Sequence, residues 1–376
     1  ATPWWEQRRQ ELLDMMASRS AAYAYDSATL DKAAGALSSL ASVDRIFYAI
    51  KANPHPGVLR VLRAAGLGME CVSPGELRRV FELFPDIDRN EVLFTPNFGE
   101  RNEYVEAFSA GVRVTVDSLY PLQFWPEVFE GRDIFVRMDL GEGSGHHQHV
   151  HTAGVRSKFG IGLEDLEALR KSCAAGNVRV VGLHVHGGSG IRDPLHWQRV
   201  AKGLIEVAGG LPDVRVLDLG GGLGVPEKEG DAPLDLAALD RSLTEIRAAL
   251  PGCQLWLEPG RYLVSEAGVL LAKVTQTKTK SGARFVGIAT GMNSLIRPAL
   301  YGAYHRIVNL SRLEGPPAGL VTVVGPICET GDRLGRDRLL PETREGDVML
   351  IANAGAYGYA MSSRYNLREP AEEIML

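Results

Sequence analysis

Short apolar runs alternate with amphipathic segments over most of the chain. Eight runs between about residues 45 and 264 are rich in strand-forming residues: 46–50, 69–72, 92–94, 112–116, 134–138, 178–185, 214–219 and 255–257. Apolar positions at helical spacing fill most of the gaps, at 58–65, 75–84, 102–110, 119–129, 163–175, 195–208 and 236–250. Such alternation is typical of a parallel sheet covered by helices. Eight units predict an α/β fold, a closed (β/α)8 barrel of the TIM type.

The pattern changes after about residue 264. Runs at 269–274, 285–289, 320–324, 348–352 and 373–376 are strand-like and are separated by turns with little helical spacing. They predict a second, all-β domain, built as a β-barrel or sandwich. The segment 22–25 is expected to add a strand to it. The predicted domains are therefore a barrel over 28–264 and a β domain made of 1–27 and 265–376.

Polar residues follow the predicted strands at their carboxyl ends, where barrel enzymes place the active site. Ser and Asp at such positions also cap helices, and we expect this for Ser73 and Asp117. Lys51, His186 and Glu258 cannot cap in that way. A lysine that ends a buried strand is costly to desolvate, which favours a nucleophilic amine able to form a Schiff base with a carbonyl.

Three consecutive glycines, Gly220, Gly221 and Gly222, follow the run 214–219. Consecutive glycines let backbone N–H groups approach an anion closely. Val225 stands where a dinucleotide-binding fingerprint needs a further glycine. In a barrel, the loops after the seventh and eighth strands often bind phosphate, and these glycines follow the seventh predicted strand.

Three further residues suggest a flat, anionic ligand. His184 and His186 lie two apart on one strand and face opposite sides, so they are not expected to share a metal. His186, nearer the strand end, is placed to stack on a flat ligand, and Ser189 to hydrogen-bond a phosphate. Glu258 is suited to keeping a pyridine nitrogen protonated. The alternative for Glu258 is an ion pair with Arg261, which would contribute little by itself.

Composition narrows the functional classes. The net charge of −5 argues against a nucleic-acid partner, and no apolar stretch approaches the about 20 residues that would span a membrane. The four cysteines have no disulfide or zinc spacing, which predicts reduced thiols in a cytoplasmic protein. Histidines at 146, 147, 149 and 151 fit no defined zinc motif. We therefore predict no metal and interpret 146–151 as a solvated or substrate-covering loop.

Six segments, in order over nearly the whole chain, resemble the alanine-racemase-fold (fold-type III) decarboxylases that use pyridoxal 5'-phosphate (PLP). They are Tyr48-Ala-Ile-Lys51-Ala-Asn53, His184-Val-His186-Gly-Gly-Ser189, Gly220-Gly-Gly222, Glu258-Pro-Gly-Arg261, Gly325-Pro-Ile-Cys328-Glu329-Thr-Gly-Asp332 and Ala354-Gly-Ala-Tyr357-Gly-Tyr359. The resemblance implies a PLP-binding barrel, a β domain, and a homodimer with active sites at the subunit interface.

Roles follow from the resemblance by position. Lys51 resembles the Schiff-base lysine, His186 the ring-stacking residue and Glu258 the partner of the pyridine nitrogen. The residues that resemble the phosphate grip are Ser189, Gly220, Gly221, Gly222, Arg261 and Tyr357. Cys328 resembles a proton donor supplied, together with Glu329, by the neighbouring subunit. The residues expected to bind substrate are Arg261, Arg297, Tyr301, Glu329 and Tyr357.

Two features depart from the family pattern. Glu70 stands where the family usually has Asp, which puts the hydrogen bonds near Lys51 in doubt. The histidine-rich loop ahead of Ser157 is similar to that of the decarboxylases that are fused behind an aspartate kinase. Because the chain also begins without Met, we consider a preceding kinase domain.

The charges expected around the substrate suggest which amino acid it is. Arg261 and Arg297 with Glu329 suit a whole remote amino-acid group, since an arginine can pair with a carboxylate through two hydrogen bonds. The expected reaction is the decarboxylation of meso-2,6-diaminopimelate to L-lysine and CO2, with Cys328 returning a proton to Cα.

Several alternatives remain open: a decarboxylase for ornithine, arginine or carboxynorspermidine, an amino-acid racemase, a phosphate-binding barrel without catalysis, and a metal hydrolase built on the histidine cluster. Racemases of this fold pair the pyridine nitrogen with Arg, so Glu258 argues against that alternative.

Overall fold

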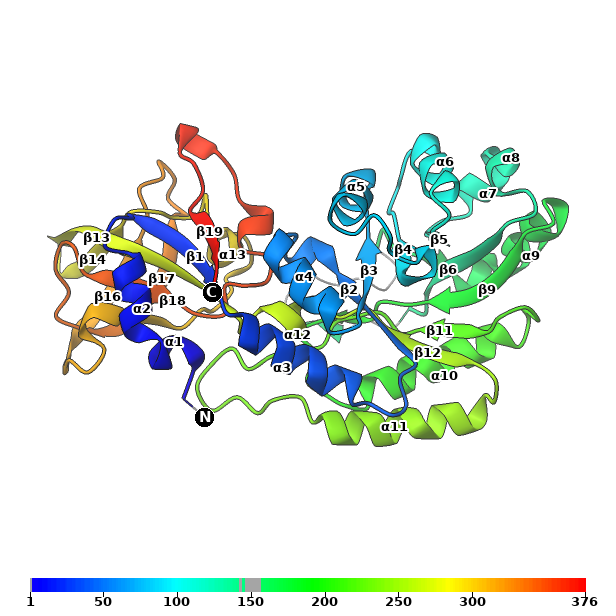
Figure 1. Cartoon of the computed structure of the whole chain (residues 1–376), viewed down its shortest axis with the longest axis horizontal. Coiled ribbons are helices and arrows are strands. Elements are labelled where there is room, and N and C mark those ends of the chain that lie inside the picture. The colour runs from blue at the N-terminus through cyan, green and yellow to red at the C-terminus, as the bar shows by residue number, and fades with distance from the viewer. Residues whose placement is uncertain (1, 142–143, 146–156) are drawn as a thin grey trace. The chain divides into compact units, whose positions relative to one another are not determined.

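A computed structural model describes residues 2–141, 144–145 and 157–376 (Figure 1). The chain forms two compact units. The barrel unit consists of Lys32–Val225 and Ala232–Tyr262, and the sheet unit of Ala1–Asp31, Pro226–Asp231 and Leu263–Leu376. The short segment Pro226–Asp231 therefore leaves the barrel unit between two of its strands, a detour that the alternation of strands and helices does not reveal.

The strands of the barrel unit run parallel and close on themselves. In chain order they are β2 (Arg45–Ala49), β3 (Gly68–Cys71), β4 (Val92–Phe94), β5 (Arg113–Val116), β6 (Asp133–Asp139), β9 (Arg179–His184), β11 (Val216–Asp218) and β12 (Gln254–Leu257). β12 pairs with β2 and β5 pairs with β6, which completes the ring. Each of the eight predicted runs overlaps one of these strands, so the predicted barrel is confirmed. β8 (Ile161–Gly162) adds to β6, and β7 (Ser144–Gly145) pairs with β10 (Gly188–Ser189).

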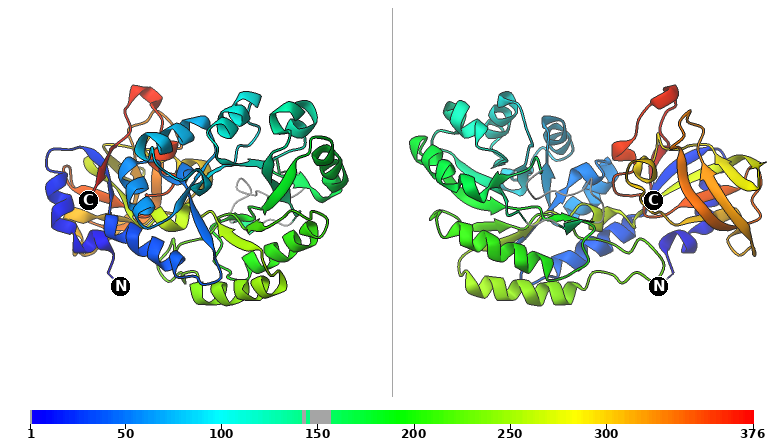
Figure 2. Two further views of the ribbon diagram at one scale, coloured as in Figure 1. Left: turned by 45° about the vertical axis from the view of Figure 1, so that its right-hand side comes forward. Right: turned by 180° about the vertical axis from the view of Figure 1, so that it is seen from behind.

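Helices cover the outside of the barrel (Figure 2). They are α3 (Ser27–Ser38), α4 (Pro56–Ala64), α5 (Pro74–Leu83), α6 (Arg101–Ser109), α7 (Tyr120–Phe124), α8 (Pro126–Phe129), α9 (Leu166–Ala175), α10 (His196–Ala208) and α11 (Leu236–Ala249). A further short helix, α12 (Arg261–Val264), follows β12 and ends in the sheet unit. The helix predicted over 119–129 is split in two, because Pro126 pushes Trp125 out of the helical region to φ −128°.

Aromatic and aliphatic side chains fill the lower part of the barrel. Phe47, Leu93, Phe135 and Val216 come from the first, third, fifth and seventh strands, the arrangement of one side-chain layer in such a barrel. The Trp256 ring packs 4.9 Å from that of Phe47 and 5.3 Å from that of Phe135. Below it, the Arg45 and Arg113 guanidinium groups lie 5.7 and 5.3 Å from the centre of the Trp256 ring. This layer closes the amino-terminal end of the barrel.

The sheet unit contains β1 (Ala21–Tyr25), β13 (Gly268–Lys280), β14 (Ala283–Ile288), β15 (Ile307–Asn309), β16 (Pro317–Val324), β17 (Arg333–Pro341), β18 (Val348–Ile351) and β19 (Glu372–Met375). The predicted strand at 22–25 is confirmed, since β1 pairs with β13 and β19. This unit is mostly sheet, which confirms the predicted second β domain. It also contains α1 (Trp4–Gln7), α2 (Arg9–Met15) and α13 (Arg297–Tyr301). The first two helices are needed because Trp5 and Leu12 cover an apolar face formed by residues such as Leu271 and Leu350.

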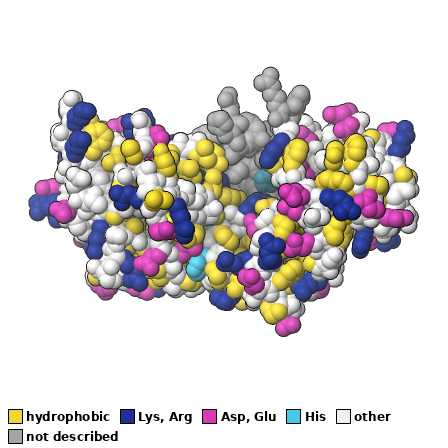
Figure 3. Space-filling view, turned by 90° about the horizontal axis from the view of Figure 1, so that it is seen from above, with side chains coloured by type: hydrophobic (Ala, Val, Ile, Leu, Met, Phe, Trp, Pro, Cys, Tyr) yellow, Lys and Arg dark blue, Asp and Glu magenta, His cyan; other side chains and the backbone are white. Residues whose placement is uncertain are grey.

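Among the residues that the structure describes, no helix is long and apolar enough to cross a membrane. On the face shown in Figure 3, basic and acidic side chains are interspersed.

Candidate active site

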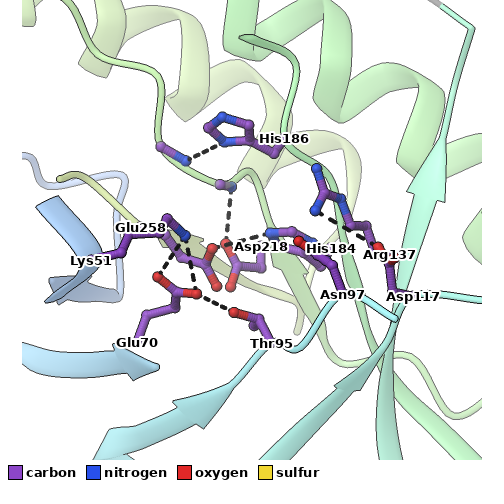
Figure 4. Close-up of polar contacts among 12 residues, drawn as sticks. Lys51, Glu70, Thr95, Asn97, Asp117, Arg137, His184, His186, Asp218 and Glu258 are labelled. Carbon is purple, nitrogen blue, oxygen red and sulfur yellow. Dashed lines mark hydrogen bonds and ion pairs between the residues drawn. The ribbon is translucent and has the colours of Figure 1, made fainter. Parts of the chain in front are cut away.

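Charged side chains gather at the carboxyl ends of the barrel strands (Figure 4). Arg137, Asp218 and Glu258 each follow a residue of the filled layer by two positions, namely Phe135, Val216 and Trp256. Because side chains alternate along a strand, all three point into the barrel above that layer. The folding pattern that fills the core thus also places the charges.

Lys51 lies just past the end of β2, in the turn Ile50–Ala52. Its Nζ is 3.0 Å from Oε2 and 3.3 Å from Oε1 of Glu70. Glu70 is fully buried, and Thr95 Oγ1 donates a hydrogen bond to its Oε1. The longer side chain at position 70 therefore still reaches the lysine.

The prediction of a desolvated lysine at a strand end is wrong in this structure. β2 ends at Ala49, and the chain turns before Lys51 at the mouth of the barrel. The Lys51 side chain is consequently 42% exposed, although its partner Glu70 is buried.

Glu258, directly after β12, lies between two other buried polar groups. His184 Nε2 is 3.1 Å from its Oε2, and both side chains are almost fully buried. Asp218, the last residue of β11, lies beside the same carboxylate, with an oxygen of each carboxyl group within 4.8 Å of the other. The backbone N–H of Gly220 donates to Asp218 Oδ1 at 2.9 Å. The three side chains therefore form one connected buried network.

Burial affects the two carboxyl groups of this network differently. Burial, with repulsion from Glu258, raises the pKa of Asp218 well above its ordinary value. Burial also acts to raise the pKa of Glu258, but the attraction of His184 and the hydrogen bonds from His184 and Asp218 outweigh it, and the pKa of Glu258 is lowered. Asp218 thus retains a proton under conditions in which Glu258 is ionised.

Atoms of His184, Asp218 and Glu258 lie within 4.8 Å of one another, a spacing that a cation also requires. The hydrogen bonds among them already account for this spacing, and we assign no ion to it. The predicted absence of a metal stays a prediction, and the histidines at 146–151 lie outside the described residues.

Arg137 and Asp117 form a second pair inside the barrel. Arg137 Nη1 is 3.7 Å from Asp117 Oδ1, and its guanidinium lies 4.4 Å from the centre of the Phe159 ring. Asp117 also accepts a hydrogen bond from the Gly160 N–H at 3.1 Å, and burial raises the pKa of its carboxyl. The predicted capping role of Asp117 is therefore wrong, because its side chain turns into the barrel. The predicted cap at Ser73 is confirmed, since its side chain accepts from the N–H of Glu76.

The three glycines after β11 pass very close to neighbouring backbone. A Cβ atom at Gly220, Gly221 or Gly222 would lie 2.3, 2.3 or 2.4 Å from a carbonyl oxygen. Gly220 and Gly222 also have φ values of +66° and +87°. Glycine is therefore required here, and the turn presents bare backbone at the mouth of the barrel.

Polar side chains border this glycine turn. The Gly221 N–H donates to His186 Nδ1 at 3.4 Å, and Arg261 Nη2 donates to Ser189 Oγ at 3.3 Å. Burial, with the positive charges of Arg137 and Lys51, lowers the pKa of His186 well below its ordinary value. His186 is thus an uncharged flat ring beside the turn, as stacking on an aromatic ligand requires.

The remaining residues of the predicted site belong to the sheet unit. Arg297 begins α13 and is buried, with Nη1 3.1 Å from His305 Nε2, and Tyr301 ends the same helix. Cys328 and Glu329 are exposed, and the Cys328 N–H donates to Asn366 Oδ1 at 2.7 Å. Tyr357 has a left-handed backbone, with φ +55°.

The site contains residues to which we assigned no role from the sequence: Thr95, Arg137 and Asp218, together with His184 as a partner of Glu258. A signal for them exists, because each inward position recurs every second residue from the filled layer. To use this signal, the register of each strand must be known. The sequence pattern defines the register only to within one residue, which is too imprecise to tell inward from outward positions.

Comparison with known proteins identifies a family that matches this chain. Residues 28–265 match the family model described as "Pyridoxal-dependent decarboxylase, pyridoxal binding domain". The chain is 37% identical over 344 residues to the diaminopimelate decarboxylase of Methanothermobacter thermautotrophicus, a match that covers 88% of this chain and 80% of that protein. The chain belongs to the diaminopimelate decarboxylase family.

Solved structures of the diaminopimelate decarboxylase family share the fold of the whole chain. One superposes with a TM-score of 0.90 at 30% identity, covering 99% of this chain and 92% of that one. The Helicobacter pylori diaminopimelate decarboxylase, solved in complex with L-lysine, gives a TM-score of 0.87 at 29% identity, with coverage of 98% and 93%. The names of these relatives give no support to the expected fusion with an aspartate kinase.

Diaminopimelate decarboxylases, as pyridoxal-dependent decarboxylases, use PLP, and the residues of the barrel fit this cofactor. Within the described part of the chain, Glu258 Oε1 is buried and accepts no hydrogen bond from an amide, amine, imidazole or hydroxyl donor. A pyridine N–H would satisfy such an oxygen. The glycine turn, where a Cβ would clash, suits the close approach of a phosphate.

Proposed function

We propose that this chain decarboxylates meso-2,6-diaminopimelate to L-lysine and CO2, with PLP as its cofactor. The observation that carries the proposal is the presence of an amine and a separate buried carboxylate at the same barrel mouth. Lys51 and Glu258 occupy that mouth beside the glycine turn, in a chain whose relatives are named diaminopimelate decarboxylases. Such an enzyme is a carboxy-lyase of lysine biosynthesis.

The barrel residues would hold the cofactor as follows. Lys51 would carry the PLP aldehyde carbon, His186 would stack on the ring, and Glu258 would accept the N–H of the pyridine nitrogen. The phosphate would be bound by Ser189, the N–H groups of Gly220, Gly221 and Gly222, Arg261 and Tyr357. When bound, PLP supplies an electron sink for the negative charge that the departing CO2 leaves at Cα.

The chain's own groups control the charge and the proton. An ionised Glu258 would keep the ring nitrogen of bound PLP protonated, which would sustain the electron demand of the ring. After CO2 leaves, a proton must return to Cα, and the exposed Cys328 thiol of the second subunit is our proposed donor. The active protein would accordingly be a homodimer, with Cys328 and Glu329 contributed across the interface.

Recognition of the remote end of the substrate would determine specificity. We assign the remote carboxylate to Arg297 with Tyr301, and the remote amine to Glu329. Arg261 and Tyr357 would contact both the phosphate and the substrate. We further propose that 28–264 acts as the PLP-binding domain, with 1–27 and 265–376 as the β domain, in a cytoplasmic enzyme.

A two-part assay tests this function. The purified protein mixed with PLP should show visible absorbance from the bound cofactor, and it should then release CO2 and lysine from the meso isomer. Ornithine serves as the matched substrate, because it has the remote amine without the second carboxylate. Turnover of ornithine but not of diaminopimelate would reject the substrate, and a chain that binds no PLP would reject the mechanism.

A further inference from the structure

Two buried side chains beside Glu258 have no task in the reaction described above. His184 comes from the end of β9 and Asp218 from the end of β11. Both are at most 2% exposed, and both contact the same carboxylate. Burying an imidazole and two carboxyl groups in one barrel is costly unless each group is satisfied by the others.

The hydrogen bond from His184 fixes one oxygen of Glu258. Since the ionised carboxylate can only accept, Nε2 of His184 must carry the hydrogen in the 3.1 Å contact with Oε2. His184 is the last residue of a central barrel strand, so its backbone is held on both sides. The contact therefore restrains the rotation of the Glu258 carboxylate and leaves Oε1 for another donor.

The contact between Asp218 and Glu258 requires a shared proton. Two carboxyl groups can hydrogen-bond each other only if one of them is protonated. Gly220 N–H occupies Asp218 Oδ1, which leaves Oδ2 to carry that proton. The opposite shifts in pKa, upward for Asp218 and downward for Glu258, agree with Asp218 as the donor.

We propose that His184 and Asp218 are positioning residues that determine where the proton between Glu258 and the cofactor ring resides. This inference rests on the proposed function, because it requires PLP at Glu258. Two hydrogen bonds donated to the Glu258 carboxylate make it a weaker base. The proton then stays on the ring nitrogen and does not pass to Glu258. A lone buried glutamate would be more basic and would draw the proton back.

Other charged groups face the same carboxylate from neighbouring strands and must remain unchanged in any test. Lys51 and Arg137 attract its negative charge, and Glu70 adds to the field at Asp218. His186 also interacts with Glu258. The test therefore substitutes only His184 and Asp218, each with a matched variant that keeps a hydrogen-bond donor.

The experiment follows the ring nitrogen directly. The protein is loaded with PLP that carries ¹⁵N in the ring, and the ¹⁵N chemical shift is measured against pH. His184→Gln keeps an N–H near the position of Nε2, whereas the shorter His184→Asn does not reach it. Asp218→Asn keeps a donor of the same shape, whereas Asp218→Leu has none.

We expect His184→Asn and Asp218→Leu each to shift the distribution of the proton from the ring nitrogen towards Glu258 by about tenfold at every pH, since a hydrogen bond to a charged group is worth that much. His184→Gln and Asp218→Asn should keep the ring protonated as in the unmodified protein. Circular dichroism checks the fold of each variant.

Deprotonation of the ring in Asp218→Asn would overturn the inference, because it would mean that Asp218 acts as a charged group. The same isosteric variant decides the matter if the leucine variant does not fold. An unchanged ¹⁵N titration in His184→Asn would also overturn it. If the unmodified protein binds no PLP, the proposed function fails instead, so the two failures are distinguishable.

Discussion

Glu70 has one methylene more than the aspartate that resembling decarboxylases usually carry at this position. In the structure, its buried carboxylate reaches both the Lys51 amine and the Thr95 hydroxyl. The substitution therefore preserves hydrogen bonding near Lys51, because the same Glu70 carboxylate contacts both the amine and the hydroxyl. The orientation of the amine depends on this carboxylate.

Replacing Glu70 tests that dependence. Glu70→Gln keeps the shape but removes the charge opposite Lys51, so we expect kcat to fall by about tenfold to a hundredfold, as losing a hydrogen bond to a charged group would predict. Glu70→Asp, the matched control, keeps the charge and should retain more activity than the glutamine variant. Equal activity of Glu70→Gln and the unmodified protein in a lysine-production assay would contradict this role.

Lys51 itself gives the second prediction at this scale. Lys51→Ala should abolish turnover and the visible absorbance of bound PLP, because no amine remains to hold the aldehyde carbon. Lys51→Arg is the matched control: it keeps a positive charge beside Glu70 yet stays protonated, so it should also be inactive. Circular dichroism should show both variants folded. Near-native activity in either would exclude Lys51 from the reaction.

At the scale of elements, the first turn of α5 interacts electrostatically with the site through the Glu76 carboxyl group. Ser73 accepts from the Glu76 N–H, and Glu76 Oε2 accepts from the Val72 N–H at 2.7 Å, one residue before the N–H used in a capping box. Burial, with repulsion from Glu70, raises the pKa of Glu76 to about 7. The helix cap is thus sensitive to pH near neutrality.

The sign of that effect can be predicted. A carboxyl whose pKa is higher in the folded state binds its proton more tightly there, so the stability it contributes is present below its ordinary pKa of 4.5 and is lost as pH rises towards 7. Urea titrations should show that the stability of the unmodified protein relative to Glu76→Gln falls over this interval and is level above it. A difference independent of pH would contradict the shifted pKa.

Much of the barrel could be predicted from the sequence, because a buried parallel strand is a nearly continuous apolar run and needs no partner to be recognised. Lys51, His186 and Glu258 were found because they end such runs. Asp117 was misassigned and Arg137 was missed, since capping and inward-facing residues look alike until the strand register is known. The exposure of Lys51 also depends on a turn that begins one residue earlier than the apolar run suggests.

At the scale of the whole molecule, the sheet unit was harder to predict than the barrel. β17 reads Arg-Leu-Gly-Arg-Asp-Arg-Leu-Leu-Pro, with charges where a strand prediction looks for alternation, and β15 has only three residues. Helices α1 and α2 cover a sheet face that is assembled from distant segments. Such packing is invisible to any local pattern.

The proposed homodimer gives a prediction at this scale. Lys51→Ala and Cys328→Ala place defects in the two units, and a site shared between subunits would need only one of these residues from each chain. Mixing the two inactive or slow variants should restore about one quarter of the activity, because half of randomly formed twofold dimers would carry one intact site. The control is each variant mixed with itself. No recovery after verified subunit exchange would contradict a shared site.

The aromatic layer at the amino-terminal end of the barrel affects how substrate enters and CO2 leaves. Among the described residues, Trp256 packs between Phe47 and Phe135, and the Arg45 and Arg113 guanidinium groups lie 5.7 and 5.3 Å from its ring centre, so side chains fill the barrel interior at this end. CO2 released above this aromatic layer must therefore leave through the carboxyl end of the barrel, where the amino acid also enters. Substrate entry and CO2 release would then follow one another through a single opening, and a ligand bound in that opening would inhibit both.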